Sequence, residues 1–532
     1  MYNIHIMVEF VLPINEEVEA PLGSIFRKIL ANRGVRFEDL TLVKTYDPFL
    51  MEGMYEAVDR ISFAIKRDER ILIHGDYDAD GITSLALLFR VLRDFGVKVI
   101  PYIPNRFSEG YGFSTNAIRK AKEEGVGLII TVDCGISSYN EVEEAKSKGI
   151  DVIITDHHLK PPKVPRTIIV HPEGYPNEGL TGVGVAFKLA HALYQHMNLE
   201  NWKTKLYNLM DLVAVGTIAD LGVLLGENRL LVKHGLNVLS NGTAKAGFKA
   251  IYKGAGISPP IKTWHISFVI APRLNAAGRL KTAMKSFELL TKTRGKDAKV
   301  FAEEIERLNR ERQKLQNRIY DMLLREINGD EPVVFAYAEG LHEGVIGIVA
   351  SKLSETFNKP AFVISVKGET SKGSARGIEP FNVFESLNTI GEIFENYGGH
   401  ALAGGFTIKT HLLEKLRKHL NDYALKVAPG GFKKTIKIDA EVFYEDLIGD
   451  DFWRDKYELE PYGPGFPEPV LLLKNTRKTV ISSDNSKVLV LGDKGICEFN
   501  AKGKVRGKGD LVITNLRRGR DGTIYGDVLG EI

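Results

Sequence analysis

The sequence contains little cysteine and no long apolar run. Only two cysteines, Cys134 and Cys497, occur among its 532 residues, too few for a disulfide framework or for a zinc site built on paired cysteines. No apolar run approaches the roughly 18 residues of a membrane span. The apolar N-terminal stretch is interrupted by Glu9 and has no basic start, so it does not resemble a signal peptide. We therefore expect a cytoplasmic protein without a membrane partner.

An excess of charge of one sign is also missing. The formal net charge is only +3, so a nucleic-acid ligand would need a local basic groove rather than attraction by the chain as a whole. Hydrophobic residues make up 44% and charged residues 26%, which is typical of a globular chain. A chain of this length exceeds a single core, and about two to four domains are expected.

Short apolar runs alternate with helical patterns in the first half of the chain. The runs that predict strands lie at 70–73, 98–103, 126–132 and 151–155, and the patterns that predict helices lie at 83–95 and 140–148. This alternation predicts an α/β fold with a doubly wound, mainly parallel sheet. Ligands bind beyond the carboxyl ends of the strands in such sheets. All of these runs except 98–103 are followed directly by Asp or His, which is the first indication of a site.

The second half predicts three further parts. Apolar residues at helical spacing over 301–327 predict a long amphipathic connecting helix, and a second, smaller α/β set follows it. Short alternating runs at 435–439, 487–491 and 510–514 predict a small β-barrel, similar to oligonucleotide-binding (OB) barrels. The expected division is an N-terminal extension without an assignable role (1–45), a sheet domain (46–295), a connecting helix (296–330), a second α/β domain (331–428) and an OB-like domain (429–532).

Four potential metal ligands lie within seven positions. They are His74, Asp76, Asp78 and Asp80. Three carboxylates this close repel one another unless a cation neutralises them. One such loop, taken alone, is more often a solvated acidic turn with a helix cap, so it does not decide the question.

The pattern recurs further along the chain. Asp133 follows one predicted strand, Asp156-His157-His158 follows the next, and Asp220 follows the apolar stretch 212–219. We expect all of them at the mouths of successive strands. Mixed imidazole and carboxylate ligands suit Mn²⁺, with Mg²⁺ where oxygen ligands dominate. Two ions about 3.5–4 Å apart need a bridging carboxylate, and Asp133 is the candidate because it stands between the other clusters.

These motifs, in this order, resemble the DHH phosphoesterase superfamily. Longer stretches resemble its RecJ branch, in particular RecJ-like proteins of archaeal type: 74–81, 130–136, 271–279 and 343–350. The glycines before His400 resemble the DHH-associated second domain. The resemblance covers roughly residues 70–410 and implies an exonuclease that acts on single-stranded nucleic acid.

The resemblance implies a role for each residue of the metal motif. One ion would be held by His74, Asp78 and Asp133, and the other by Asp80, Asp133, His157 and Asp220. His158 would point toward the substrate phosphate, while Asp76 and Asp156 would lie behind the ligands. The implied reaction is hydrolysis of a phosphodiester by hydroxide held between two divalent cations, Mn²⁺ favoured and Mg²⁺ the alternative.

The resemblance also implies a pocket for a terminal 5′-phosphate. Its residues would be Arg106, Arg279, Ser374 and Arg376, and guanidinium forks suit such a dianion. Gly398 and Gly399 would bring backbone amides close to a phosphate, with His400 as a further donor. Asn275 and His342 are weaker candidates. For any single arginine of this set, pairing with a surface glutamate is an equally common role.

The C-terminal part contains an alternating basic run, Lys502, Lys504 and Arg506. On a strand these side chains would share one face. Aromatic residues at Trp453, Tyr462 and Phe466 would supply stacking surfaces for unpaired bases. A solvated charged strand is the ordinary alternative.

The sequence therefore predicts a metal-dependent exonuclease of single-stranded DNA with 5′→3′ polarity, with single-stranded RNA as a further substrate, acting in DNA replication or repair. Two alternatives stay open. One is a short-oligonucleotide or cyclic-dinucleotide phosphodiesterase of the same superfamily. The other is a replication scaffold that binds the GINS complex, since archaeal RecJ-like proteins resemble a eukaryotic helicase subunit that has lost catalysis.

Overall fold

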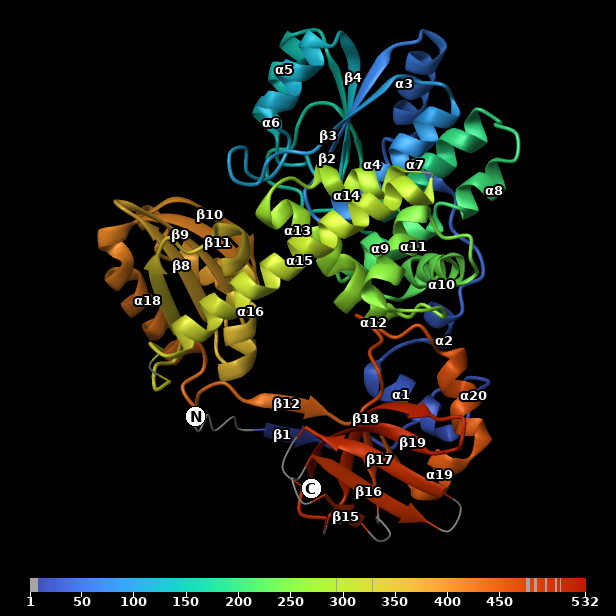
Figure 1. Cartoon of the computed structure of the whole chain (residues 1–532), viewed down its shortest axis with the longest axis vertical. Coiled ribbons are helices and arrows are strands. Elements are labelled where there is room, and N and C mark those ends of the chain that lie inside the picture. Colours follow the sequence, from blue (N-terminus) through green and yellow to red (C-terminus); the bar gives the residue numbers. More distant parts are fainter. Residues whose placement is uncertain are drawn as a thin grey trace.

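The chain folds into three lobes, placed like the corners of a triangle (Figure 1). The structure is a computed structural model that describes residues 8–292, 294–327, 329–474, 479–482, 486–492, 495–502, 505–507 and 509–532. No helix within these ranges is both long and apolar enough to cross a bilayer. The first lobe runs from α3 to α14, the second from β7 to α18, and the third contains the strands from β13 onward.

A five-stranded parallel sheet forms the centre of the first lobe. Its order is β3-β2-β4-β5-β6, with bounds Val99–Tyr102, Arg70–Gly75, Val126–Val132, Asp151–Thr155 and Ile168–Val170. Alternate residues of β2 enter different cores: Ile71 and Ile73 pack on one face, and Leu72 packs on the other. Both faces are therefore covered, which explains the continuous apolar runs and confirms the doubly wound fold.

Helices supply both of these covers. One face carries α3 (Met54–Lys66), α4 (Ala79–Asp94) and α7 (Gly182–His196). The other carries α5 (Thr115–Glu123) and α6 (Tyr139–Ser147). The lobe continues with a helical part made of α8 (Trp202–Tyr207), α9 (Met210–Ala219), α10 (Gly226–Ser240), α11 (Ala246–Ala255), α12 (Thr263–His265), η2 (Ile266–Ile270), α13 (Ala271–Leu280) and α14 (Met284–Thr291).

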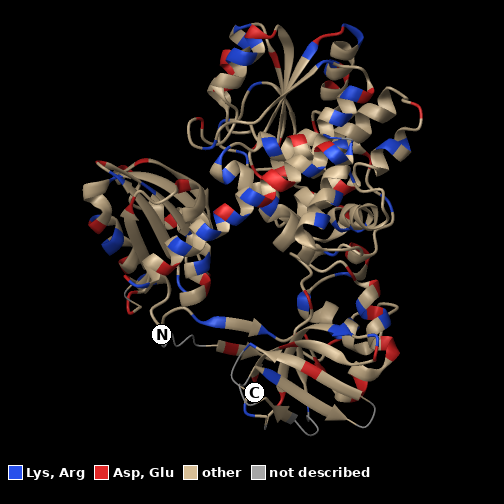
Figure 2. Cartoon of the chain, viewed as in Figure 1, with Lys and Arg blue, Asp and Glu red and all other residues tan. Residues whose placement is uncertain are grey.

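The connecting helix is α15 (Gly295–Leu324), with 30 residues. At 1.5 Å per residue it is about 45 Å long. Its buried residues Ile305 and Leu308 lie against the first lobe, and Ile319 and Leu323 against the second. Basic and acidic residues alternate along its exposed side (Figure 2) and form ion pairs one turn apart. The predicted connecting helix is thus present.

A mixed five-stranded sheet forms the second lobe. Its order is β10-β11-β9-β8-β7, with bounds Phe394–His400, Ala403–Lys409, Thr370–Arg376, Ala361–Lys367 and Val334–Glu339. Helix α16 (Glu343–Phe357) packs on one face, and α17 (Val383–Asn388) and α18 (Leu413–Val427) pack on the other.

The third lobe contains a seven-stranded sheet in the order β13-β14-β18-β19-β17-β16-β15. The bounds are Ala440–Val442, Leu471–Leu473, Leu511–Arg518, Ile524–Glu531, Gly495–Ala501, Lys487–Gly492 and Thr479–Ile481. Two short helices, α19 (Tyr444–Ile448) and α20 (Asp450–Glu458), pack beside it. The C-terminal part is therefore rich in β-structure, and its OB-like topology stays a prediction.

One predicted barrel strand lies elsewhere. β12 (Lys434–Lys437) does not join the seven-stranded sheet but pairs in parallel with β1 (Val8–Val11). The N-terminal helices α1 (Ser24–Arg33) and α2 (Phe37–Leu40) follow β1. Phe26, Ile29 and Leu30 are almost fully buried in the core of the third lobe. The N-terminal segment, for which the sequence indicated no role, thus completes the hydrophobic core of the C-terminal lobe.

The predicted stacking surface and basic strand of this lobe are not formed. Trp453, Tyr462 and Phe466 are at most 5% exposed, so they belong to the core and cannot stack on bases. Lys502 and Arg506 lie beyond the end of β17, outside any strand, so they share no strand face. Lys504 lies outside the described residues.

Candidate active site

Parallel strands bring three of the predicted clusters to one edge of the sheet. β2 ends at Gly75, directly after His74; Asp133 follows β4, and Asp156 follows β5. These strands are hydrogen-bonded neighbours, so their carboxyl ends lie together. Asp133 has a left-handed backbone with φ of 60°, a conformation that aspartate tolerates better than most residues.

Asp220 reaches the same place from a helix rather than a strand. It caps the C-terminus of α9, so the expectation that it follows a strand is wrong. The run 212–219 is apolar except for Thr217 and fits a buried helix as well as a buried strand. All residues of α9 except Ala219 are buried, which explains why the run shows no amphipathic helical pattern.

Two aspartates are fixed by backbone amides. Asp78 caps α4 and accepts from the amides of Asp80 and Gly81 at 3.0 and 3.1 Å. Asp80 accepts from the amides of Gly182 and Val183 at 2.7 and 2.9 Å, at the start of α7. The glycine-rich start of α7, Gly182-Val-Gly184, was not singled out from the sequence, although a helix that begins with glycines indicates a close approach to another group.

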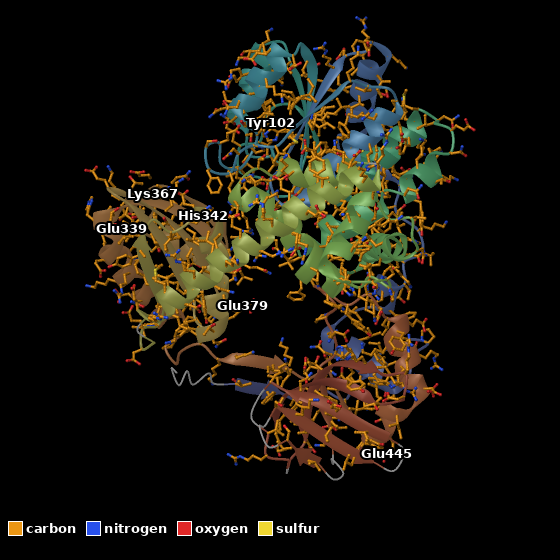
Figure 3. All side chains as sticks on the ribbon, viewed as in Figure 1. Tyr102, Glu339, His342, Lys367, Glu379 and Glu445 are labelled. Atoms are coloured by element: carbon orange, nitrogen blue, oxygen red, sulfur yellow. The ribbon has the colours of Figure 1, made fainter. Side chains whose placement is uncertain are left out.

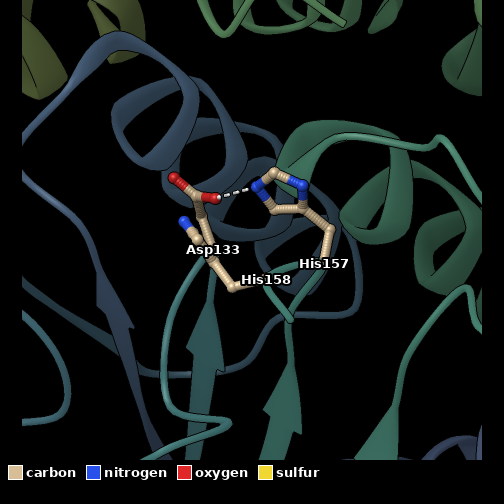
Figure 4. A group of neighbouring side chains, drawn as sticks. All are labelled: Asp133, His157 and His158. Atoms are coloured by element: carbon tan, nitrogen blue, oxygen red, sulfur yellow. Dashed lines mark ion pairs between the residues drawn. The ribbon is translucent and has the colours of Figure 1, made fainter. Parts of the chain in front are cut away.

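The acidic and imidazole groups converge. There are three sets of side chains, and within each set the ligand atoms lie within 4.8 Å of one another. The sets are Asp76, Asp78 and Asp133; Asp80, His157 and Asp220; and Asp133, His157 and His158. Asp133 and His157 each belong to two of them. His157 Nε2 lies 3.1 Å from Asp133 Oδ1, as Figure 4 shows, and 3.7 Å from Asp220 Oδ2. Seven of the predicted site residues therefore meet at the sheet edge, whereas the predicted ligand His74 belongs to none of the three sets.

His74 is held between aromatic rings and is completely buried. Its ring stacks on Tyr102 and meets the edge of Phe113, each at a centroid distance of 5.4 Å. Burial lowers the pKa of His74 to about 4, so its imidazole is neutral at pH 7. Cys134 Sγ lies 3.5 Å from Nδ1, whereas the buried Nε2 has no hydrogen-bond partner. A neutral imidazole with a free Nε2 is the form that binds a metal ion.

The carboxylates show the same need for a cation. Burial, followed by repulsion from neighbouring aspartates, raises the pKa of Asp80 and of Asp133 well above the ordinary value. Oδ1 of Asp76 is buried without a hydrogen-bond partner, and the buried atoms Oδ1 of Asp133 and Nε2 of His157 lie 3.1 Å apart without forming a hydrogen bond. Unpaired buried polar atoms are costly and rare. Because several of them face one another, these residues fit divalent cations, although no ion is part of the structure.

Asp156 and His158 form a different kind of pair. Asp156 accepts from the amides of Ile136, His157 and His158, and from His158 Nδ1 at 2.7 Å. Burial favours neutral His158, but the bond to Asp156 outweighs it and raises the pKa of His158 to about 9. Asp156 therefore holds a cationic imidazole beside the ligand cluster. Tyr111, which the sequence did not indicate, places its hydroxyl 3.1 Å from His158 Nδ1.

The predicted phosphate residues meet across the first and second lobes. Arg279 is partly buried and donates to the carbonyl of Gly344 at 3.2 Å. Burial, and then repulsion from Arg106, Arg312 and Arg376, lowers the pKa of Arg279 to about 9. Burial and Arg106 also lower the pKa of Arg376. Guanidinium groups gathered this closely destabilise one another unless an anion lies between them.

Strand register places the second-lobe candidates in two rows on the same face of the sheet, with the row of Gly399, Gly404 and Ala375 between them. Gly398, Gly405 and Ser374 are opposite one another on β10, β11 and β9, and His400, Ala403 and Arg376 form the second row. Opposite residues and residues two apart share a face. His400 and Arg376 therefore stand on a face whose floor is made of glycine and alanine, which leaves room for a ligand.

The two weaker candidates lie beside this region. His342 caps α16 and its ring is 5.5 Å from that of Phe107 of the first lobe; Figure 3 shows it on the side of the second lobe that faces the first. A pocket of about 490 Å³ lies here, lined among others by Phe107, His342, Lys367 and Lys372. Asn275 Oδ1, on the same helix as Arg279, is buried without a hydrogen-bond partner.

Known protein families match the two lobes described above. Residues 70–217 match the DHH family, N-terminal domain, and residues 330–426 match the DHHA1 domain. The single-stranded-DNA-specific exonuclease RecJ of Salmonella typhimurium is 33% identical over 486 residues, which is 85% of this chain and 84% of that protein. The chain belongs to the RecJ family.

Other RecJ proteins extend beyond this chain. RecJ of Bacillus subtilis is 41% identical over 442 residues, and that of Thermus thermophilus is 36% identical over 426. The aligned part is 55% and 62% of those proteins, less than two thirds of each. The crystal structure of RecJ from Thermus thermophilus in complex with Mn²⁺ has a TM-score of 0.85 at 28% identity, and it covers 98% of this chain and 78% of that one. The RecJ fold thus extends over all three lobes.

Proposed function

We propose that this protein is a metal-dependent exonuclease that removes nucleotides from the 5′ end of single-stranded DNA. The observation that carries the proposal is the convergence of acidic and imidazole side chains around Asp133 and His157 at the end of the sheet, where buried ligand atoms make no hydrogen bond. The RecJ relatives are named as single-stranded-DNA-specific exonucleases, and this chain shares their fold.

Two divalent cations would be held by this cluster. We assign His74, Asp78 and Asp133 to one, and Asp80, Asp133, His157 and Asp220 to the other. When bound, the ions supply a lowered pKa for coordinated water and stabilise negative charge on the phosphoryl oxygens. The protein contributes by holding its ligands rigid: the amides at the start of α7 fix Asp80, and those at the start of α4 fix Asp78.

His158 would contact the scissile phosphate. Its imidazole keeps a proton at pH 7 because Asp156 supports the charged form, so it can donate a charge-assisted hydrogen bond to a phosphate oxygen. Asp76 would act from behind the ligands; one of its carboxylate oxygens lies within 4.8 Å of ligand atoms of Asp78 and Asp133.

Polarity would come from the arginine cluster. A terminal 5′-phosphate between Arg106, Arg279 and Arg376 would relieve the repulsion that lowers the pKa of Arg279. Ser374, Gly398, Gly399 and His400 would line the same phosphate site. A pocket that receives a chain end and excludes a continuing chain restricts cleavage to that end.

The choice of metal ion is also part of the proposal. We favour Mn²⁺ over Mg²⁺ because two imidazoles belong to the ligand set, although RecJ structures from Thermus thermophilus are in complex with either ion. Single-stranded RNA as a second substrate, a role in replication or repair, association with GINS and cytoplasmic location stay predictions from the sequence.

End-labelled oligonucleotides test the proposed function. Single-stranded DNA and RNA, labelled at either end and carrying a 5′-phosphate or a 5′-hydroxyl, are incubated with Mn²⁺, Mg²⁺ or EDTA. We expect mononucleotides to be released from the 5′ end of DNA with Mn²⁺ and none with EDTA. Cleavage that persists in EDTA, or release that starts at the 3′ end, would contradict the assignment. Faster cleavage of dinucleotides than of long strands would favour the short-oligonucleotide alternative.

A further inference from the structure

The segment that follows Asp220 has an unusual backbone. Residues 221–225 connect α9 to α10 without helix or strand. Leu221 has φ of +58° and is 68% exposed. Two hydrogen bonds close the end of α9 around this residue: the amide of Leu221 donates to the carbonyl of Ile218 at 3.2 Å, and that of Gly222 to the carbonyl of Thr217 at 2.8 Å, the pattern in which a left-handed residue ends a helix. The backbone next to the candidate metal ligand is therefore closed by α9 itself, and the segment beyond it makes contacts with other parts of the chain.

Those contacts belong to two different lobes. Leu224 is fully buried in the core of the first lobe, whereas its neighbour Leu225 packs on the core of the third. The amide of Leu224 donates to the carbonyl of Pro464 at 2.7 Å. The five residues after Asp220 thus bridge the metal-site lobe and the C-terminal lobe.

The third lobe presents a glycine turn to this bridge. A Cβ atom at Gly463 would lie 2.6 Å from Leu224 Cδ1, and one at Gly465 would lie 2.6 Å from Val223 Cγ1. Gly465 also has φ of +80°. Side chains at either position would push the bridge away, so the turn 463–466 is shaped for close approach to it.

Arg229 fastens this arrangement. It lies in α10, is 2% exposed, and donates to three main-chain carbonyls of the C-terminal lobe: Leu40, Leu459 and Pro461, at 3.0, 2.6 and 2.7 Å. Its guanidinium lies 5.6 Å from the ring centre of Phe466. Burial lowers the pKa of Arg229 to about 10, so it remains charged at neutral pH. Figure 1 shows α10 and α2 on either side of this junction.

We propose that Arg229 is a positioning residue for the metal centre, acting through Asp220. Its hydrogen bonds to Leu459 and Pro461 hold the residues before the turn 463–466 against α10. The turn then holds the bridge 221–225, which keeps the carboxylate of Asp220 beside His157. The C-terminal lobe is then a structural part of the metal site. This inference rests on the proposed function, because it assumes that Asp220 binds one of the cations.

A consequence is that metal binding and the docking of the C-terminal lobe are thermodynamically linked. A change that loosens the turn from the bridge should weaken cation binding, and bound cation should strengthen the docking by the same factor. The effect should appear on substrates too short to reach the C-terminal lobe, which separates it from any loss of strand binding.

The test measures Mn²⁺ binding directly, without turnover. Full-length wild-type protein, Arg229→Met, Arg229→Lys, Asp220→Asn and the double variant Arg229→Met with Asp220→Asn are titrated with Mn²⁺, and free ion is followed by its EPR signal. Arg90→Met serves as the matched control. Arg90 is likewise an arginine of the first lobe that donates to a carbonyl, that of Leu290 at 2.7 Å, but it is less buried than Arg229 and lies near the far end of α4.

We expect Arg229→Met to reduce the Mn²⁺ affinity of the site that contains Asp220 about tenfold, as is usual for residues that orient ligands, and Arg229→Lys to reduce it less. The double variant should bind no more weakly than Asp220→Asn alone, because both changes act on one carboxylate. Arg90→Met should bind as the wild type does.

Two results would overturn the inference. One is Mn²⁺ affinity within twofold of wild type in Arg229→Met; the other is a double variant that shows the product of the two single losses. If Arg229→Met does not fold, the same comparison is made with Arg229→Lys, alone and combined with Asp220→Asn. Wild-type protein that binds no Mn²⁺ would overturn the proposed function together with this inference, so the two failures are distinguishable.

Discussion

Replacing Gly182 by alanine should disable the metal centre without removing a ligand. A Cβ atom at this position would lie 2.4 Å from Asp133 Oδ1 and 2.6 Å from its Cγ. The first distance is about 1 Å shorter than an ordinary contact of 3.4 Å. Asp133 is packed at the sheet edge and only 2% exposed, so its carboxylate has to shift by about that amount.

A displacement of 1 Å in an active site typically costs about a hundredfold in rate, or about 2.7 kcal/mol of transition-state stabilisation. We expect kcat/KM of Gly182→Ala to fall by about this factor. The helix itself does not oppose the change, because alanine is favoured over glycine in helices by up to about 1 kcal/mol. The assay is Mn²⁺-dependent release of mononucleotides from a 5′-phosphorylated strand, alongside thermal unfolding.

Gly179→Ala is the matched control. It lies three residues upstream in the same segment, and a Cβ atom there would meet nothing within 4 Å. It should retain wild-type activity. The reasoning is refuted if Gly182→Ala folds normally and keeps activity within threefold of wild type, since the contact with Asp133 would then be without consequence.

Further predictions concern the ligands, the phosphate pocket and the C-terminal lobe. Asp133→Ala should abolish Mn²⁺-dependent turnover, measured at saturating Mn²⁺, because two of the three ligand sets contain Asp133. Arg376→Met should lose the preference for 5′-phosphorylated over 5′-hydroxyl strands by about tenfold or more, as expected for a lost charge-assisted hydrogen bond, in a comparison of kcat/KM. Burial, followed by the nearby Asp78, raises the pKa of Asp220 to about 7, so Mn²⁺ binding at pH 7 should release protons and tighten from pH 6 to pH 8, measured by calorimetry in two buffers. Although Lys502 and Arg506 lie outside any strand, the basic run stays a candidate for binding the DNA backbone, and charge reversal at Lys504 and Arg506 should weaken binding of long single-stranded DNA and spare cleavage of very short oligonucleotides.

Each of these has a contrary outcome. Normal Mn²⁺-dependent activity in Asp133→Ala would rule out a bridging role for Asp133. An unchanged preference for 5′-phosphorylated strands in Arg376→Met would show that Arg376 is not part of the 5′-phosphate pocket. Proton release as large in Asp220→Asn as in wild type shows that another group titrates. Equal losses on long and short strands at the two basic positions argue against a groove there.

Local pattern was sufficient for the sheet lobe and its site. The strands around Ile71, Ile129 and Ile153 are continuous apolar runs because both faces are covered, and the residue after each run must lie at the carboxyl edge. His74, Asp133 and His157 could therefore be placed together from the sequence. The helix before Asp220 was misread for a related reason: complete burial removes the polar face that distinguishes a helix from a strand.

Contacts between distant parts of the chain could not be predicted in this way. The sequence cannot distinguish aromatic residues that stack on bases from aromatic residues of a core, as at Trp453, Tyr462 and Phe466. Only the packing of Phe26 and Arg33 against this region shows that these three are core residues. The glycine start of α7 is equally inconspicuous, because its importance depends on Asp80 and Asp133, which are about 50 or more positions away.

The parallel pairing of β1 with β12 has a consequence for biosynthesis. More than 420 positions separate Val8 from Lys434, and α1 buries Phe26 and Leu30 among side chains that lie beyond residue 439. The segment around β1 and α1 therefore has no completed partner until the residues from Lys434 onward have been synthesised. During that interval its apolar residues remain uncovered and prone to association, which makes this stretch the expected client of a chaperone that acts on nascent chains.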